Sequence, residues 1–469
     1  MILLLAFGLV LPSIVMYIAL VELWIRSDGQ SRRLLAAAVA PALGIGAASC
    51  VYFILLLASR APMVQALDAG LWLMAGGWLL FERRRRPMAA LPALRTPREW
   101  RPLLVLTAGA CVTAILAVTV AAWLNVTVTP HGQSDAIAIW NLRARSVLRS
   151  APDWGLVLSP AISWSQPDYP LLVPLTVARL WSYTGGESLL IPQSVAMLFF
   201  LSSVATLGLL VGEARGWIAG SMSAMAVVAA RTFVFQTSCQ CADVPLGFFV
   251  LVAISFAVTA RERTTPAPWL VVAGAAAALG AWTKNEGQLL LVVVALFVLA
   301  GFPKARLRAA GLFVAGAALP VAAVALFKLH LSPLGGFFAL QTSEAIAGKL
   351  ADPARWTIVL SQMWGLTKQW GGGSVNAIAG VAAGVALAAR TDRGSVRGAV
   401  SGVLLVIAVL SGYTIAYVIT PWPLAWHIAT SFERLIVQLW PATVWALFQL
   451  TGTRRPETRP VFGSSGDVS

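Results

Sequence analysis

Long apolar runs recur along this chain from one end to the other, and short polar gaps separate them. A run of roughly 20 apolar residues is long enough to cross about 30 Å of hydrocarbon as an α-helix. Such a helix satisfies its own backbone hydrogen bonds, which lipid cannot do, and the short alternating segments of a membrane β-barrel are not visible. The pattern predicts an all-α polytopic integral membrane protein with about thirteen transmembrane helices. They are expected near residues 1–24, 34–57, 66–81, 102–125, 189–211, 216–234, 244–260, 267–282, 286–302, 309–328, 374–390, 398–419 and 435–452.

Composition and charge extend this prediction to the topology. The chain is 58% hydrophobic and 11% charged, whereas soluble domains carry about 25% charged residues. The net charge of +15 does not indicate nucleic-acid binding, because Lys and Arg gather in short gaps between the apolar runs. Alternate gaps hold most of them, which is typical of the cytoplasmic side. These gaps lie near 26–33, 82–101, 212–216, 261–266, 303–308, 391–397 and 453–460.

This charge pattern places the N-terminus outside, the C-terminus in the cytoplasm, and two long segments, 126–188 and 329–373, outside. Both segments are rich in Trp, so we expect short interfacial helices in them, one of them at 170–184. The first run is interpreted as a retained anchor. Three regions follow: 1–101, an extension of about three transmembrane helices; 102–330, a core with the external loop 126–188; and 331–469, with the second external loop, the last transmembrane helices and a cytoplasmic tail.

Three aspartates lie close to the predicted outer face, where a carboxylate beside a bilayer is costly. Asp135 follows the fourth run, Asp168 stands between two prolines, and Asp243 opens a later run. Each has a simpler structural interpretation: Asp135 and Asp243 could cap helices, and Asp168 could occupy a turn. Cys239 and Cys241 flank the same face, but their spacing is not a standard zinc signature.

Cations lie on the same predicted face. Lys284, Asn285 and Glu286 occupy a tight hairpin, and His427 and Arg434 are seven residues apart, so they share a face of a helix. The plain interpretations are a polar hairpin tip and an interfacial pair. Together with the acids, these cations suit transfer from a lipid-phosphate carrier: an acid activates a hydroxyl, and cations hold a phosphate.

The order of these motifs resembles that of the GT-C membrane glycosyltransferases. The similarity is closest to bacterial proteins related to glycosyltransferase family 39, the dolichyl-phosphate-mannose protein mannosyltransferase group; the lipid A aminoarabinose transferases are more distant. It covers about residues 102–450 and leaves 1–101 unmatched. The segments that carry it are 135–145, 167–172, 242–246, 283–287 and 426–431.

This resemblance implies an enzyme of the bacterial inner membrane with its active site facing the periplasm or exterior. It would be an inverting glycosyltransferase that moves a sugar from a polyprenyl-phosphate donor to an acceptor glycan, lipid or protein in the cell envelope. Asp135 corresponds to the catalytic base and Asp243 to a second acid. Asp168, the third expected catalytic residue, lies where relatives carry His-Lys-Pro or Glu-Lys-Pro, and this chain lacks that lysine.

Phosphate contacts are therefore expected from Lys284, Arg434 and His427. The single acid at Asp135, in place of an adjacent pair, predicts no metal site, although the chemistry leaves room for a divalent ion such as Mg²⁺ or Mn²⁺. The remaining expected substrate contacts are Trp140, Arg143, Tyr169, Asn285, Glu286 and Trp426.

Two other functions remain open on the sequence. A secondary transporter or flippase of a lipid-linked or anionic substrate would show paired repeats and charges near the bilayer midplane, and neither pattern is visible. A non-catalytic scaffold in a polysaccharide assembly complex would not need Asp135, Asp243 and Lys284 on one face. The lack of visible repeats and the placing of these three charged residues on one face both favour an enzyme over the two alternatives.

Overall fold

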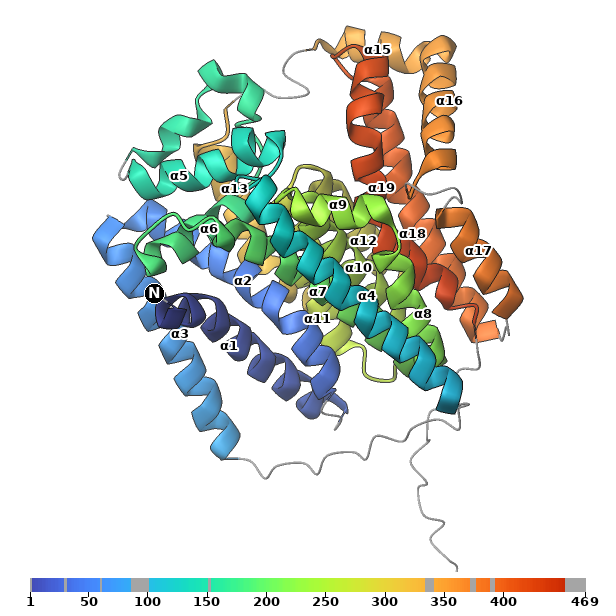
Figure 1. Ribbon diagram of the computed structural model, residues 1–469, viewed down its shortest axis with the longest axis horizontal. Helices are drawn as coiled ribbons and strands as arrows, with labels where there is room; N and C mark the ends of the chain where they lie inside the picture. The colour runs from blue at the N-terminus through green and yellow to red at the C-terminus, as the bar shows by residue number, and fades with distance from the viewer. Residues whose placement is uncertain are drawn as a thin grey trace, which may run out of the picture.

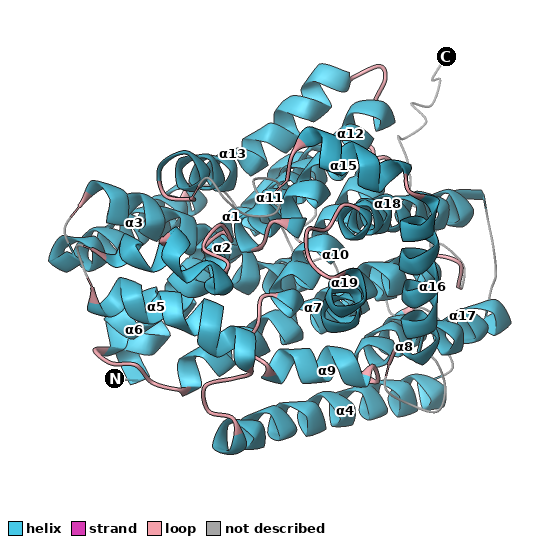
Figure 2. Ribbon diagram, turned by 90° about the horizontal axis from the view of Figure 1, so that it is seen from above, coloured by secondary structure: helices cyan, strands magenta, loops and turns pink. Residues whose placement is uncertain are grey.

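The computed structural model describes residues 2–28, 32–59, 61–85, 101–150, 153–333, 341–371, 377–388 and 393–451. These residues form helices joined by short loops, with no β-strand among them, which confirms the all-α class (Figures 1 and 2). The long helices are α1 (Ile2–Asp28), α2 (Arg33–Ala58), α3 (Ala61–Arg84), α4 (Arg101–Val128), α7 (Leu190–Arg215), α10 (Asp243–Ala260), α11 (Ala267–Thr283), α12 (Glu286–Gly301), α13 (Arg306–His330), α16 (Pro353–Gln369), α18 (Arg393–Val418) and α19 (Leu424–Phe448).

Shorter helices fill the two long segments and the remaining gaps. They are η1 (Ala136–Trp140), α5 (Asn141–Arg149), η2 (Trp154–Leu158), η3 (Pro160–Ser165), α6 (Leu172–Thr184), α8 (Trp217–Val228), α9 (Arg231–Ser238), α15 (Ser343–Ala351) and α17 (Ala377–Ala388). The basic pair at 454–455 and the end of the chain lie outside the described residues.

Eight of the described helices are long and apolar enough to cross a membrane: α1, α2, α3, α4, α7, α10, α13 and α18. The bent pair α8 and α9, with an angle of 64° between them, would make a ninth. Every expected apolar run contains a helix, but the count of thirteen is not confirmed. One physical reason is length: α11 has 17 residues and α12 has 16, so each reaches only about 25 Å.

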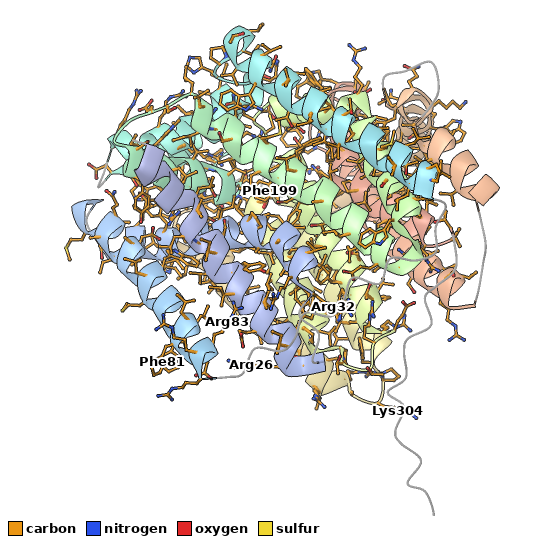
Figure 3. The ribbon with its side chains drawn as sticks, turned by 60° about the horizontal axis from the view of Figure 1, so that its bottom comes forward. Arg26, Arg32, Phe81, Arg83, Phe199 and Lys304 are labelled. Atoms are coloured by element: carbon orange, nitrogen blue, oxygen red, sulfur yellow. The ribbon has the colours of Figure 1, made fainter. Side chains whose placement is uncertain are left out.

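The basic gaps meet at one end of the bundle. Arg26 lies 3.5 Å from Glu82, and Arg32 lies 3.0 Å from Glu213. The gap 212–216, which contains Glu213, is also connected to the gap 391–397, because Arg215 donates a 2.7 Å hydrogen bond to Ser395. In Figure 3, Arg26, Arg32, Arg83 and Lys304 gather at the end of the bundle that faces down in Figure 1. The described residues of these gaps, which are predicted to share one side of the membrane, therefore lie at one end of the molecule.

The middle of the bundle is α10, in which 94% of the residues are buried, whereas only 6% of an 18-residue apolar stretch of α4 is buried. Figure 2 shows this arrangement from above, with α4 along the outside of the bundle. Because α10 begins at Asp243, the most enclosed of the described long helices carries one of the predicted site acids at its first position.

The helix expected at the membrane interface, 170–184, is instead enclosed by protein. All residues of α6 except Ser182 and Thr184 are buried, and α6 packs against α1, α2, α5 and α7. A buried ion pair joins it to α3, since Arg179 lies 2.7 Å from Asp68. The first three helices, for which no resemblance is seen, therefore cover α6 and are part of the same core.

The second long segment forms α15 and α16, which stand beside α18 and α19 at the top of Figure 1. Trp370 is buried and lies 4.6 Å from the Trp440 ring. Trp364 is 62% exposed, which fits the interfacial role expected of this segment.

Candidate functional site

Several helix ends meet at the end of the bundle opposite the basic gaps. Asp135 immediately precedes η1, Asp243 opens α10, and Lys284 lies between α11 and α12. Arg434 reaches the same place from within α19. Residues far apart in the sequence thus form one charged network.

Asp243 is the centre of this network and is completely buried. Its Oδ1 accepts hydrogen bonds from Lys284 Nζ at 3.0 Å and from Gln438 Nε2 at 2.7 Å. Its Oδ2 accepts from Arg434 Nε at 3.0 Å and Nη2 at 2.8 Å. A buried carboxylate is tolerated when charge and hydrogen bonds compensate it, and here both oxygens are compensated.

Lys284 connects the network to α12 and to the first long segment. Its Nζ lies 2.8 Å from Glu286 Oε1 and 5.7 Å from the centre of the Tyr169 ring. Glu286 Oε2 has no hydrogen-bond partner among the described residues. This second oxygen is thus buried without a hydrogen bond, while Oε1 is held by Lys284.

Arg434 bridges the two acids that the resemblance singles out. Its Nη1 donates a 2.6 Å hydrogen bond to Asp135 Oδ2 while its other nitrogens hold Asp243. The Asp135 side chain is 32% exposed and that of Arg434 is 23% exposed. Asp135 makes no side-chain capping bond to η1, so its carboxylate serves the charged network instead.

The backbone around Asp135 is fixed by the turn that precedes α10. Gln133 N donates to Cys239 O at 3.3 Å, and Asn141 Nδ2 donates to Gln240 Oε1 at 3.0 Å. Gly132 has φ +77°, and a Cβ there would lie 2.7 Å from Cys239 O, so this close approach requires glycine. The C-Q-C turn therefore positions the Asp135 loop; Cys239 and Cys241 are buried and unbridged.

Asp168 belongs to a second, adjoining group. Its carboxylate accepts a 2.7 Å hydrogen bond from Asn285 Nδ2. Lys328, from the end of α13, donates to Asp168 O at 2.6 Å and to Asn285 Oδ1 at 3.0 Å. We did not expect Lys328 from the sequence, because a lysine at the end of an apolar run is typical of an interfacial anchor.

Trp140, Arg143 and Tyr169 pack together next to the charged network. Trp140 stacks on Tyr169 with ring centres 5.8 Å apart. Arg143 is completely buried and donates to the backbone carbonyls of Tyr169, Ser165 and Gln166. Burial lowers the pKa of the Arg143 guanidinium to about 10 and raises the pKa of the Tyr169 hydroxyl. The structure thus assigns Trp140 and Arg143 to holding the loop that carries Asp168.

His427 and Trp426 lie on α19 before Arg434, and in the described structure neither hydrogen-bonds to a charged side chain of the network. His427 Nδ1 lies 2.9 Å from Thr420 Oγ1, and its ring packs against Tyr417 and Trp422. The Trp426 side chain is 58% exposed. The structure therefore brings Asp135, Asp243, Lys284, Glu286 and Arg434 into direct contact, with Asp168 and Asn285 beside them, but gives His427 and Trp426 other neighbours.

Within the network, the acidic and basic side chains neutralise one another's charge. Arg434 and Lys284 face the three carboxylates of Asp135, Asp243 and Glu286. In the described part of the chain, no group of three or more His, Cys, Asp or Glu residues could hold a metal ion. Two cavities, of about 430 and 520 Å³, lie elsewhere, and neither is lined by a residue of the network.

The fold and this site define an all-α integral membrane protein with a buried network of acids and cations where several helix ends converge. Comparison with protein-family models, with curated proteins and with solved structures finds no match to this chain.

Proposed function

We propose that this protein is an inverting membrane glycosyltransferase of the GT-C type. It would transfer a sugar from a polyprenyl-phosphate donor to an acceptor glycan, lipid or protein on the non-cytoplasmic side of the membrane. The observation that carries the proposal is the contact of the accessible Asp135 carboxylate with Arg434, beside further cations at the helix ends. A partly exposed acid and nearby cations are the two kinds of group that this reaction needs.

Asp135 is the candidate base because it is more exposed than the other acid that Arg434 binds. Asp243 is completely buried, whereas the Asp135 side chain is 32% exposed. In the proposed step, Asp135 accepts the proton of the acceptor hydroxyl while the oxygen of that hydroxyl attacks the anomeric carbon. The bond from that carbon to the phosphate oxygen breaks, the phosphate leaves with the electron pair, and the anomeric centre inverts.

Lys328 and Arg434 are the candidate phosphate contacts. Arg143 is completely buried against carbonyls, and Lys284 is 4% exposed between Asp243 and Glu286. Lys328 is half-buried, and its hydrogen bonds go to the neutral oxygens of Asp168 and Asn285. A cation that holds only neutral acceptors gains most from an anionic ligand.

Arg434 also couples the donor to the base. In the structure it donates to Asp135, and a guanidinium is also a strong hydrogen-bond donor to phosphate oxygens. A donor phosphate bound to Arg434 would therefore lie next to the Asp135 carboxylate that takes the proton of the acceptor hydroxyl. The buried Asp243 would keep Arg434 in place throughout.

The proposed cellular location is the bacterial inner membrane, with the basic end of the bundle in the cytoplasm. The site would then face the periplasm or exterior, where a polyprenyl-phosphate sugar presents its head group. Membrane lipids, the donor and the acceptor would be the partners of the protein.

Sugar release by purified protein in nanodiscs tests this proposal. Wild-type protein is incubated with a panel of radiolabelled polyprenyl-phosphate sugars, with and without EDTA, and the free or transferred sugar is measured. We expect turnover of one donor. Absence of turnover with every donor, by protein that is folded, would contradict the proposal and favour transport or a scaffold role.

A further inference from the structure

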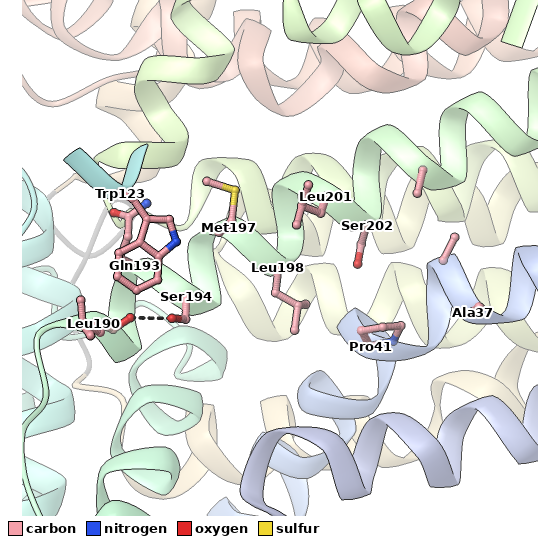
Figure 4. Close-up of a pocket in the computed structure, with 12 residues that line it drawn as sticks. Ala37, Pro41, Trp123, Leu190, Gln193, Ser194, Met197, Leu198, Leu201 and Ser202 are labelled. Atoms are coloured by element: carbon pink, nitrogen blue, oxygen red, sulfur yellow. Dashed lines mark hydrogen bonds between the residues drawn. The ribbon is translucent and has the colours of Figure 1, made fainter. Parts of the chain in front are cut away.

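A groove of about 430 Å³ runs between α2, α4 and α7, away from the charged network (Figure 4). Its walls are largely apolar and include Pro41 of α2, Trp123 of α4 and Leu198 of α7. All three helices are candidate membrane spans, and only 6% of an 18-residue apolar stretch of α4 is buried. The groove therefore lies on the side of the bundle that faces lipid.

One polar side chain in this groove has no partner. Gln193 is 3% exposed, yet neither its Nε2 nor its Oε1 makes a hydrogen bond to the described residues. The neighbouring Ser194 is satisfied by its own helix, since it donates to Leu190 O at 2.7 Å. Burying an amide without a hydrogen bond is costly, so Gln193 points to a ligand that supplies the missing bond.

The position of Gln193 along α7 indicates which part of a ligand it meets. The 26 residues of α7 rise about 39 Å, which exceeds the hydrocarbon thickness of about 30 Å by roughly 4 to 5 Å at each end. Gln193 is three residues from the start of α7, or about 4.5 Å along its axis. Its amide therefore lies near the boundary between hydrocarbon and head groups.

The shape of the groove suits a chain better than a compact molecule. Its α7 wall extends from Leu190 to Ala205, a rise of about 22 Å. None of the residues that line it carries a charge. A polyprenyl phosphate carries its negative charge directly at the end of its chain, and the groove offers no cation to bind that charge. A glycerophospholipid instead has a neutral ester region at the end of its acyl chain, which needs no cation.

We propose that this groove binds one acyl chain of a membrane glycerophospholipid, and that the Gln193 amide hydrogen-bonds to the glycerol ester region. The tightly held lipid fills the space between α4 and α7 and completes the packing of α4. This inference is independent of the proposed glycosyl transfer.

Photo-crosslinking tests it. The full chain is placed in nanodiscs that contain phosphatidylglycerol with a diazirine in one acyl chain, and crosslinked peptides are mapped by mass spectrometry. We expect crosslinks to concentrate at residues 197–205 of α7 and 37–41 of α2. Filling the groove with Leu198→Trp, or with Ser202→Phe if the first variant folds poorly, is expected to reduce them at least fivefold.

Val292→Trp is the matched control, because Val292 is 55% exposed on α12, outside the groove. It is expected to leave the crosslinks unchanged. Gln193→Leu is expected to reduce the lipid retained in native mass spectrometry several-fold. Crosslinks spread evenly over the lipid-facing helices, or insensitive to the filling variants, would overturn the proposal. So would preferential capture of a photoactivatable polyprenyl phosphate at the same residues.

Discussion

Asp243 shows how a fully buried charge can be stable in this protein. Its two carboxylate oxygens are held by Lys284, Arg434 and Gln438, and Tyr413 in turn donates a 3.0 Å hydrogen bond to Gln438. Removing one member of a buried ion pair leaves the other charge uncompensated, which is more damaging than never forming the pair. The arrangement thus makes Asp243 a positioning residue for both cations.

Asp243→Asn is therefore expected to destabilise the fold. The substitution preserves shape but leaves Lys284 and Arg434 with less compensation, so we expect a loss of about 3 kcal/mol of unfolding free energy. Denaturant unfolding in detergent measures it. Asp153→Asn, at an exposed position, is the control; a change no larger than that of the control would contradict this view of Asp243.

Lys328 is predicted to contribute to donor binding. Hydrogen bonds to charged groups are worth about 1.5–3 kcal/mol, so Lys328→Gln is expected to raise KM for the donor about tenfold or more, with a small effect on kcat. Lys328→Arg keeps the charge and is expected to retain most of the affinity. Lys304→Gln, at the other end of the molecule, is the control, and an equal effect of both glutamine variants would argue against a direct contact.

The gathering of the charged residues was predictable, but their pairing was not. Asp135, Asp243, Lys284 and Arg434 were placed on one face by the alternation of apolar runs and basic gaps, and they contact one another in the structure. Their order cannot reveal that Arg434 bridges two acids. The role of Lys328 could not be predicted from the sequence, because its partners, Asp168 O and Asn285 Oδ1, come from two other segments.

At the scale of elements, α5 is anchored to the turn between α6 and α7. Glu187 in that turn accepts a 2.7 Å hydrogen bond from Arg149 Nη2 and a 3.2 Å hydrogen bond from Arg145 Nε. Arg145 also lies over the Trp181 ring, 5.6 Å from its centre. These contacts fix α5, which follows directly on η1 and Asp135.

This anchor predicts a pH dependence of stability. The hydrogen bond from Arg149 lowers the pKa of Glu187 below its ordinary value, and Arg145 lowers it further. A group with a lowered folded-state pKa stabilises the fold above the unfolded-state pKa, about 4.3 for Glu, and this contribution is lost as the pH falls through the folded-state pKa.

Glu187→Gln should thus lower the melting temperature by a constant amount between pH 7 and pH 5, and by less below about pH 4. Melting curves of both proteins across this range measure the difference. The exposed Glu433→Gln serves as the control variant. A difference between wild type and Glu187→Gln that grows on acidification would refute the assignment.

The environment of α6 could not be predicted from its own sequence. Its apolar and aromatic residues fit an interfacial helix as well as they fit a helix buried in protein. Only the packing of α1, α2 and α3 against it distinguishes these two environments. The Asp68–Arg179 ion pair joins residues more than a hundred positions apart. No local pattern marks them as partners, since Asp68 lies near the start of an apolar run and resembles a flanking charge.

At the scale of the whole molecule, charged groups separate to the two ends of the bundle. Glu82, Glu213 and Ser395 connect the basic gaps at one end, and the Asp243 network occupies the other. The alternation of helix directions that produces this separation was predictable from the gaps. The number of transmembrane helices was not predictable. A run of 16 or 17 apolar residues has the composition of a transmembrane helix but not the full length of one.

The proposed orientation is testable by cysteine labelling. All four native cysteines are buried, so an impermeant maleimide has little background. Leu156→Cys, at a position 73% exposed in the first long segment, is expected to react in intact spheroplasts. Lys304→Cys is expected to react only after permeabilisation, and the reverse pattern would invert the topology and place the site in the cytoplasm.

The most direct test of the central claim is the single-turnover rate of sugar transfer by Asp135→Asn with a saturating donor. Loss of a general base typically costs about 10²–10⁴-fold in rate. The account predicts a loss in that range, with an unchanged melting temperature and with full activity in Glu433→Gln, which alters an exposed carboxylate beside Arg434. A rate for Asp135→Asn within about twofold of wild type would contradict the account, because no other acid bound to Arg434 is open to solvent in the described structure.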